Sequence, residues 1–171
     1  AFAARCARND LACAKPSFAN DVVYREAYAV PYGIASCYNV LPVGGGAFTL
    51  ARLNLQAAAA QATDTEDLLS RVLPEAVRLN CEFMDAKIAF LIEKSLFFRS
   101  NFLVQEGFLH QDRFTGMFGV VGLAECVNHL EALEGRAGVL YGHSDAADSL
   151  AHRVMSRLTE LVNEYASPYC A

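Results

Sequence analysis

The fold is decided by residues 32–55, which read YGIASCYNVLPVGGGAFTLARLNL. β-Branched and aromatic residues lead into this stretch from Val22 and predict a strand that ends near Ala35. A turn-rich loop follows, carries Cys37 and closes in three consecutive glycines. Residues 48–55 alternate well enough to predict a second strand, although the same apolar spacing is compatible with the start of a helix.

A long helix is predicted downstream of this stretch. Thr63 and Glu66 stand three residues apart, which is the spacing of a capping box and predicts where the helix begins. Apolar residues then recur at helical spacing out to about Phe97. Pro74 lacks a backbone N–H group, so we expect it to kink this helix or divide it.

The remaining chain predicts one further strand and two further helices. Residues 101–113 are polar and irregular, whereas residues 114–121 have strand character. A short helix follows and is expected to end at Gly135. Ser144 is placed to cap a last helix, which a Ser-Pro pair stops. This order of strands and helices predicts an α/β fold, and the absence of repeats and linkers predicts one structural unit over residues 1–171.

The composition limits the classes of protein to which the chain can belong. Hydrophobic residues make up 54% and charged residues 19%, which predicts strands buried on both faces or apolar surface that a missing part of the same protein covers. The net charge of −5 offers no basic surface for nucleic acid, and no apolar stretch approaches the ~20 residues that cross a bilayer. Residues 1–5 lack the charged-then-apolar order of a secretory signal and the sequence begins without Met, so the natural start is expected upstream.

The six cysteines stand at irregular spacings, which predicts reduced thiols and a cytoplasmic protein. Cys6 and Cys13 do not form a CxxC pair, so no zinc site is expected. Cys81 and Cys126 fall on or beside apolar helical stripes and are expected in the core. Cys37 differs, because it follows an apolar strand at the place where α/β folds carry their chemistry. From the residues alone, Cys37 is compatible with a nucleophile, a radical relay or a small buried apolar side chain.

Motifs on both sides of Cys37 resemble those of the glycyl radical enzymes. Residues 15–21, KPSFAND, are similar to the Pro-x-Phe-x-Asn-Asp segment that precedes the thiyl cysteine in that superfamily. Similar segments follow in the same order at residues 34–37, 43–44, 51–55 and 114–125. The first three resemble the cysteine loop and following strand of pyruvate formate-lyase, and the last resembles the Gly-Leu-x-Glu segment of anaerobic ribonucleotide reductase. The combination is most similar to the YjjI-type glycine radical enzymes.

This resemblance implies a fold and a chemistry. The fold would be part of a ten-stranded barrel, namely one half-barrel that carries the thiyl-cysteine finger loop and has outer helices. In such enzymes a radical SAM activating enzyme, which uses S-adenosylmethionine and an iron–sulfur cluster, installs a glycyl radical that takes a hydrogen atom from the cysteine. The thiyl radical then takes hydrogen from a small organic substrate in anaerobic metabolism. Cys37 would be the catalytic thiol, and no bound metal is expected in this chain.

The resemblance also implies a substrate site near Cys37. Ser36 and Asn39 flank the cysteine, and we expect their side chains and those of Arg52 and Glu125 to bind substrate, although Arg52 matches the family pattern only to within one residue. Structural roles are also compatible with the sequence. Arg52 suits a salt bridge in a barrel, and Glu125 lies in the first turn of its helix, where the helix dipole favours a carboxylate.

Two departures from the family pattern refine the prediction. The radical glycine of the family lies in an Arg-Val-x-Gly-aromatic loop, and residues 1–171 contain no such motif. The chain is therefore expected to be an internal fragment of a single barrel domain that is inactive alone. Pyruvate formate-lyase carries two adjacent cysteines, whereas Ser36 precedes Cys37 here, which argues against acyl transfer between two thiols.

Two other functions remain open from the sequence. One is a conventional cysteine-nucleophile enzyme, and the other is a non-catalytic barrel remnant that binds a partner supplying the missing half. For the radical enzyme the expected partners are a small-molecule substrate, the activating enzyme, the remainder of the barrel and a second copy in a homodimer. Neither nucleic acid nor a membrane is expected as a partner.

Overall fold

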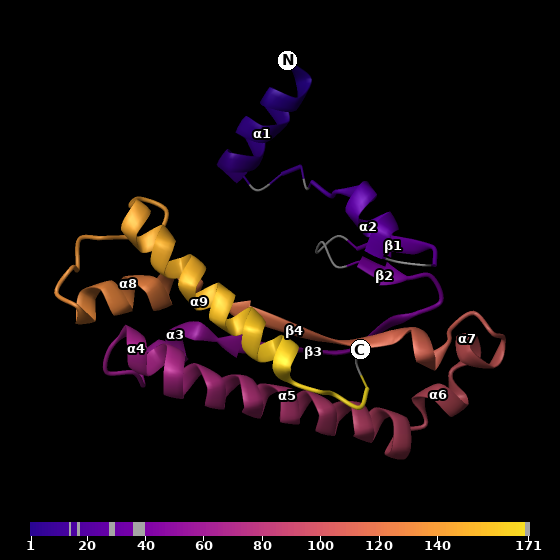
Figure 1. Ribbon diagram of the computed structural model, residues 1–171. Coiled ribbons are helices and arrows are strands. Elements are labelled where there is room, and N and C mark those ends of the chain that lie inside the picture. Colours follow the sequence, from indigo (N-terminus) through magenta and orange to yellow (C-terminus); the bar gives the residue numbers. More distant parts are fainter. Residues whose placement is uncertain (14, 17, 28–29, 36–39, 170–171) are drawn as a thin grey trace.

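The structure is a computed structural model and describes residues 1–13, 15–16, 18–27, 30–35 and 40–169 (Figure 1). The elements in chain order are α1 (Phe2–Cys13), α2 (Asp21–Ala27), β1 (Tyr32–Ile34), β2 (Val40–Pro42), β3 (Gly46–Asn54), α3 (Leu55–Ala59), α4 (Thr65–Asp67), η1 (Leu68–Val72), α5 (Leu73–Ala89), η2 (Phe90–Lys94), α6 (Phe97–Ser100), α7 (Phe102–Gln105), η3 (Gln111–Arg113), β4 (Phe114–Val121), α8 (Leu123–Leu133) and α9 (Asp145–Glu164). Helices and strands are therefore mixed, as the sequence predicts.

The strands form two small sheets and no closed barrel. Strands β1 and β2 pair antiparallel, and β3 and β4 pair parallel, with two strands in each sheet among the described residues. A barrel closes only when a sheet has enough strands for its two edges to meet. The predicted half-barrel is thus not confirmed, and the β3–β4 ladder forms an open layer, with Gly46 opposite Phe114 and Asn54 opposite Val121 at its ends.

Strand β3 forms because its side chains alternate between the two faces of this layer. Thr49, Ala51 and Leu53 are buried on the face that α5 covers, and the residues between them are more exposed. The strand ends at Asn54, whose side-chain oxygen accepts a hydrogen bond from the backbone N–H of Ala57 at 3.1 Å and begins α3. Residues 48–55 therefore contain both the strand and the helix start that their spacing allowed.

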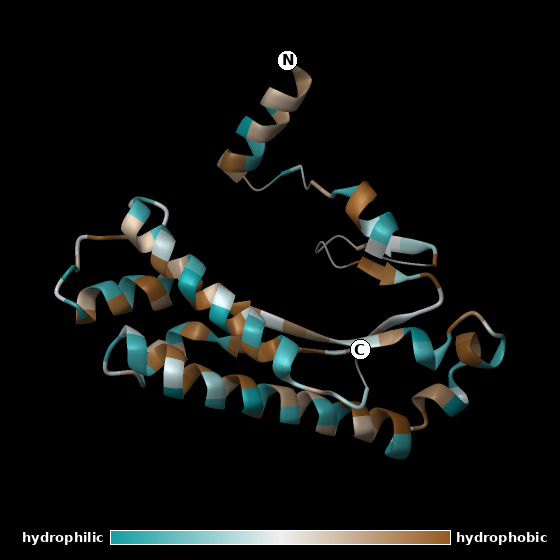
Figure 2. Cartoon of the chain, viewed as in Figure 1, coloured by the Kyte–Doolittle hydropathy of each residue, from teal (hydrophilic) through white to brown (hydrophobic). Residues whose placement is uncertain are grey.

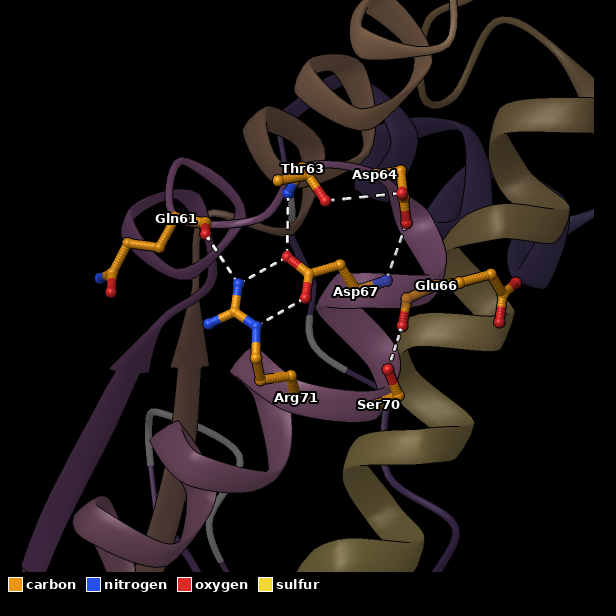
Figure 3. Close-up of polar contacts among 7 residues, drawn as sticks. All are labelled: Gln61, Thr63, Asp64, Glu66, Asp67, Ser70 and Arg71. Carbon is orange, nitrogen blue, oxygen red and sulfur yellow. Dashed lines mark hydrogen bonds and ion pairs between the residues drawn. The ribbon is translucent and has the colours of Figure 1, made fainter.

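The long helical segment, α4 to η2, begins one residue later than the sequence predicts. Asp64 is the N-cap, and its carboxylate accepts a hydrogen bond from the N–H of Asp67 at 2.8 Å (Figure 3). In return the Asp67 carboxylate accepts the N–H of Thr63 at 3.0 Å. The predicted pair of Thr63 and Glu66 was wrong by one position, because Asp is as good an N-cap acceptor as Thr and spacing alone allows either register.

Pro74 marks a change of helix type within the long helix, which continues past it. The expected division is therefore confirmed, and it is confined to one turn. Pro74 lies in the first turn of α5. The five residues before α5 form the π-helical turn η1, and the N–H of Leu73 donates to the carbonyl of Leu68. A widened turn of this kind lets the helix pass a residue that cannot donate a backbone hydrogen bond.

The N-terminal part differs from its sequence prediction. Residues 22–24 lie in α2 and not in a strand. Local helix signals explain the difference: the Asn20 side chain accepts the N–H of Val23 at 3.4 Å, and Asp21 pairs with Arg25 at 2.7 Å one turn later. These capping and ion-pair contacts outweigh the preference of two consecutive valines for a strand, because that preference depends on packing that this exposed segment lacks.

In the C-terminal two-fifths of the chain, the structure confirms some predictions and differs from others. The strand over residues 114–121 is confirmed as β4, and α8 ends before Gly135, which has a φ of +79°. Residues 101–113, expected to be irregular, contain the short helix α7 and the turn η3, because the Asn101 side chain caps α7 at the N–H of Leu103. Ser144 occupies the N-cap position of α9, but its side chain makes no capping hydrogen bond.

The main core lies between the β3–β4 layer and helices α3, α5, α8 and α9 (Figure 1). Its largest fully buried apolar side chains are Leu55, Leu68, Leu73, Val127, Leu130 and Val154. Figure 2 shows this pattern as apolar residues along β3 and α3 and many polar residues along α5 and α9. No helix of the described chain has the length and apolar character that crossing a bilayer requires.

Candidate functional site

The cysteine motif lies between the two strands of a hairpin. Strands β1 and β2 pair antiparallel, with Ile34 opposite Val40. The predicted site residues Ser36, Cys37 and Asn39 fall between these two positions and lie outside the described residues. The strand that the sequence predicts to end near Ala35 is present as β1, which is short and partly exposed, since Ile34 is 44% exposed in a two-stranded ladder. The hairpin lies on the side of the β3–β4 layer opposite α5 (Figure 1).

Contacts from α2 hold the first strand of this hairpin. The Tyr32 hydroxyl donates a hydrogen bond to the carboxylate of Asp21, and this bond raises the pKa of Tyr32. The Tyr32 ring also packs edge-on against Tyr24, with 5.9 Å between the ring centroids. Asp21 belongs to the segment that resembles the Asn-Asp motif before the thiyl cysteine. The motif and the hairpin are therefore in direct contact.

The three glycines after the hairpin allow close packing of backbone on backbone. A Cβ atom at Gly45 would lie 2.0 Å from the carbonyl oxygen of Arg113, and Gly44 has a φ of +78°. The N–H of His110 donates to the carbonyl of Gly44 at 2.7 Å, and the guanidinium of Arg113 donates to the carbonyl of Val43 at 2.9 Å. In this structure the glycines join the starts of β3 and β4, as their lack of a side chain allows.

Arg52 lies on the face of the layer that α5 does not cover. It is exposed and stands opposite Gly119 of β4, where a Cβ atom would come 3.1 Å from Cγ of Arg52. The absence of a side chain at Gly119 therefore makes room for the Arg52 stem. Among the described residues, no hydrogen bond or ion pair engages its guanidinium, so the alternative of a salt bridge finds no partner there.

Glu125 lies near the carboxyl end of the same strands. It is an exposed residue in the first turn of α8, where the helix dipole favours its charge. The turn into α8 is made by Gly122, whose φ is +82° and whose missing Cβ would lie 3.2 Å from the backbone nitrogen of Gln56. No ion pair or hydrogen bond joins Glu125 to Arg52 within the described chain. His129, one turn later, is partly buried.

A buried carboxylate on α8 was not predicted from the sequence. Glu131 is 1% exposed, and its carboxylate accepts a hydrogen bond from Nε of Arg136 at 2.6 Å. Arg136 also pairs with Glu134 at 2.7 Å, and Glu134 accepts a hydrogen bond from the Thr65 hydroxyl. The Thr65 and Arg136 bonds lower the pKa of Glu134. The only sign of this burial in the sequence was a glutamate one position after Leu130 in an apolar stripe. We assign the network of Glu131, Arg136, Glu134 and Thr65 a structural role.

The two buried thiols have environments unlike that of a reactive cysteine. Cys81 and Cys126 are buried in the core, which confirms their prediction, and burial raises the pKa of Cys126 to about 11. A raised pKa removes the thiolate that nucleophilic attack requires. Cys6 and Cys13 are free thiols on α1. The part of the chain that the structure describes contains no cluster of three or more His, Cys, Asp or Glu side chains able to hold a metal ion.

Comparisons with known proteins cover the whole chain. The family model described as "Glycyl radical enzyme YjjI-like" matches residues 1–171. A Haemophilus influenzae protein described as uncharacterized is 40% identical over 168 residues, which are 98% of this chain and 32% of the relative. An Escherichia coli protein described as "Uncharacterized protein YjjI" is 42% identical over 157 residues, 91% of this chain and 30% of the relative. The chain thus spans about one third of the length of these relatives.

No solved structure matches the chain. The family match extends from the first residue to the last and includes the hairpin, the glycines after it, the β3–β4 layer and the start of α8. The curated relatives agree with that match. The chain therefore belongs to the YjjI-like family of glycyl radical enzymes.

Proposed function

We propose that this chain is the part of a glycyl radical enzyme that carries the thiyl cysteine, and that Cys37 is this residue. The observation that supports the proposal is the family match together with the position of Cys37 between the paired residues Ile34 and Val40. On this proposal the 171 residues are an internal part of one cytoplasmic barrel domain. The β3–β4 layer contributes two of the barrel strands, and α3, α5, α8 and α9, which enclose the main core with this layer, lie outside them.

The proposed reaction consists of two hydrogen-atom transfers. A glycyl radical, on a residue outside this chain and formed by a radical SAM activating enzyme, takes the hydrogen atom of the Cys37 thiol. The products are an intact glycine and a thiyl radical. The thiyl radical then takes a hydrogen atom from a C–H bond of a small organic substrate, which regenerates the thiol and leaves a substrate radical. A sulfur radical requires a dry and rigid site, and the contacts that Tyr32 makes with α2 favour rigidity.

Substrate contacts are proposed for Ser36, Asn39, Arg52 and Glu125. Arg52 is the best supported of these, because its guanidinium is exposed beside the hairpin side of the layer and finds no acceptor among the described residues. A guanidinium in such a position suits a carboxylate or phosphate group of the substrate. For Glu125, a substrate contact is supported only by its exposure near the carboxyl end of the layer.

Replacing Cys37 in the full-length, activated protein tests the proposal. Cys37→Ala should abolish turnover and leave the glycyl radical visible by electron paramagnetic resonance, because the glycine is oxidised before the thiol takes part. The matched control is Cys13→Ala, which removes an exposed thiol on α1 and should leave both signals unchanged.

Other outcomes point to the alternatives. Turnover that survives in Cys37→Ala would remove this residue from the mechanism. Turnover without a glycyl radical, combined with rapid alkylation of Cys37, would favour a conventional nucleophile. A parent sequence without a radical glycine, and a protein that cannot be activated, would favour a non-catalytic remnant that binds a partner.

A further inference from the structure

A turn at residues 42–45 connects the cysteine hairpin to the β3–β4 layer (Figure 1). The N–H of Gly45 donates to the carbonyl of Pro42 at 3.0 Å, and Gly44, the third residue of the turn, has a φ of +78°. The geometry of a turn sets the directions of the two chain segments that leave it. The direction in which the hairpin projects from the layer therefore depends on how this turn is held.

The segment that precedes β4 holds the turn by two hydrogen bonds. The Arg113 guanidinium donates to the carbonyl of Val43 at 2.9 Å. The backbone N–H of His110 donates to the carbonyl of Gly44 at 2.7 Å. On the other side, the N–H of Val43 donates to the carbonyl of Pro31 at 2.7 Å, which joins the turn to the start of the hairpin. A series of hydrogen bonds thus leads from the start of β4 through the turn to the hairpin.

The turn also packs closely against Arg113. A Cβ atom at Gly44 would lie 3.2 Å from Nη1 of Arg113, and a Cβ atom at Gly45 would lie 2.0 Å from the Arg113 carbonyl oxygen. Arg113 is partly buried, and within the described chain no carboxylate forms an ion pair with it. Its side chain and its backbone are therefore both used at this turn.

Hydrogen-atom transfer is sensitive to small displacements of the hairpin. The reacting atoms must approach to about 3–3.5 Å, and a misplacement of about 1 Å can cost about 100-fold in rate. Val43 in the turn is separated from Val40, at the far end of β2, by about 10 Å at the rise of a strand. A rotation of about 6° at the turn moves a point at that distance by about 1 Å. A residue that fixes the turn therefore controls the position of the hairpin on the scale that matters for the reaction.

We infer that Arg113 is a positioning residue for the thiyl cysteine. Its guanidinium holds the turn at residues 42–45, and the turn holds the hairpin at the angle that brings Cys37 within reach of the radical glycine and the substrate. Arg113 acts through the backbone carbonyl of Val43 and does not touch the reacting atoms. The inference rests on the proposed function of Cys37 and extends it to a residue 76 positions further along the chain.

Arg113→Met in the full-length, activated protein tests the inference, because methionine keeps an unbranched stem and removes the donor. The glycyl radical should form to the same extent. We expect kcat to fall about 10- to 100-fold and KM to change by less than about threefold, since Arg113 does not contact substrate. Arg113→Lys, which keeps a donor, should recover part of kcat. The matched control is Arg99→Met, which changes an exposed arginine on α6 and should leave both constants unchanged.

A measurement without substrate follows the first hydrogen transfer. In D2O the Cys37 thiol carries deuterium, which it passes to the glycyl radical. The thiyl radical then takes back the original hydrogen and leaves deuterium on the glycine, so the splitting due to that hydrogen disappears from the electron paramagnetic resonance spectrum. The splitting should disappear at least about tenfold more slowly in Arg113→Met than in the unmodified protein. Unchanged kcat and an unchanged rate of this exchange would overturn the inference, as would a loss confined to KM.

Amide hydrogen exchange in the same variant requires no activation and separates positioning from general destabilisation. The amides of residues 32–34, 40 and 41 should exchange about tenfold faster, because a hydrogen bond from a charged donor is lost at the base of the hairpin. The amides of residues 114–121 should be unchanged. Faster exchange throughout β3 and β4 would show that Arg113 supports the layer in general, which contradicts the inference.

The result for Cys37 distinguishes failure of this inference from failure of the proposed function. Turnover that persists in Cys37→Ala removes the proposed function itself. If Cys37→Ala abolishes turnover and Arg113→Met retains it, only the role of Arg113 is wrong.

Discussion

At the scale of single residues, Tyr32 connects the cysteine hairpin to the helix before it. Tyr32→Phe keeps the ring that packs on Tyr24 and removes the hydrogen bond to Asp21. We expect the backbone amides of residues 32–34, 40, 41 and 43 to exchange about fivefold faster in the full-length protein, since a net hydrogen bond is worth about that factor or somewhat more. Exchange measured by mass spectrometry checks this.

The control for Tyr32→Phe is Tyr141→Phe, since the Tyr141 hydroxyl is in an exposed side chain and only its backbone N–H forms a hydrogen bond among the described contacts. If Tyr32 positions the thiyl loop, its variant should also lose turnover while the glycyl radical signal stays. An unchanged exchange pattern at the hairpin would show that the contact with α2 does not hold it.

Substitutions at two glycines with similar backbone angles distinguish the effect of backbone strain from the effect of steric contact. Gly122 and Gly135 have φ values of +82° and +79°, but only at Gly122 would an added Cβ atom have neighbours within 4 Å, namely atoms of Gln56 and Asn54. Gly135→Ala should lower the free energy of unfolding by about 1–2 kcal/mol through backbone strain alone. Gly122→Ala should cost more, because α3 must also move. Equal effects in thermal unfolding would contradict the close packing of the two helix starts.

At the scale of elements, the start of the long helix depends on one carboxylate. Asp67 accepts hydrogen bonds from Nε and an Nη atom of Arg71, each at 2.6 Å, and from the N–H of Thr63 (Figure 3). The Arg71 bond first, and then the Thr63 bond, lower the pKa of Asp67 from 3.8 to about 2. Folding therefore favours the ionised form of Asp67. Near this pKa the folded protein binds fewer protons at the Asp67 carboxyl group than the unfolded protein does.

The pH dependence of stability follows from that lowered pKa. The contribution of Asp67 should be fully present above about pH 4 and lost as the pH falls from about 4 to about 2. Asp67→Asn should lower Tm at pH 6 and flatten the Tm profile between pH 4 and 2. Glu160→Gln, which removes an exposed pair with Arg157 on α9, should leave the shape of the profile unchanged. Identical profiles for both variants would remove Asp67 from this role.

At the scale of the whole molecule, a charge network around the buried Glu131 joins segments that are distant in the sequence. Glu131 and Glu134 of the α8 region meet Arg136, and Glu134 reaches Thr65 at the start of the long helix. Arg136→Met should leave the buried Glu131 carboxylate without its partner, at a cost of about 1–3 kcal/mol. Arg78→Met, which breaks two exposed pairs on α5, should have a much smaller effect on unfolding by denaturant.

A second variant distinguishes an unpaired charge from lost packing at Arg136. Adding Glu131→Gln to Arg136→Met neutralises the buried carboxylate, so the double variant should recover part of the lost stability. If the double variant is less stable than Arg136→Met, the arginine contributes mainly through its packing and not through the charge of Glu131.

The sequence alone determined the features that depend on neighbouring residues. The helical spacing after Asp64 and the glycine that ends α8 were sufficient, because hydrophobic periodicity and backbone freedom are local properties. The spacing over residues 48–55 left a strand and a helix start open, and the structure contains both. The order of motifs around Cys37 also identified the family correctly. The helix α2 and the shifted cap were missed, since short segments carry competing local signals of similar strength.

Only the tertiary structure decided which distant residues meet. The carbonyl of Arg113 explains the missing side chain at Gly45, and the Thr65 hydroxyl donates a hydrogen bond to Glu134, 69 positions further along the chain. These contacts join segments far apart in the sequence, and their free energy depends on distances and burial that residue order does not encode directly.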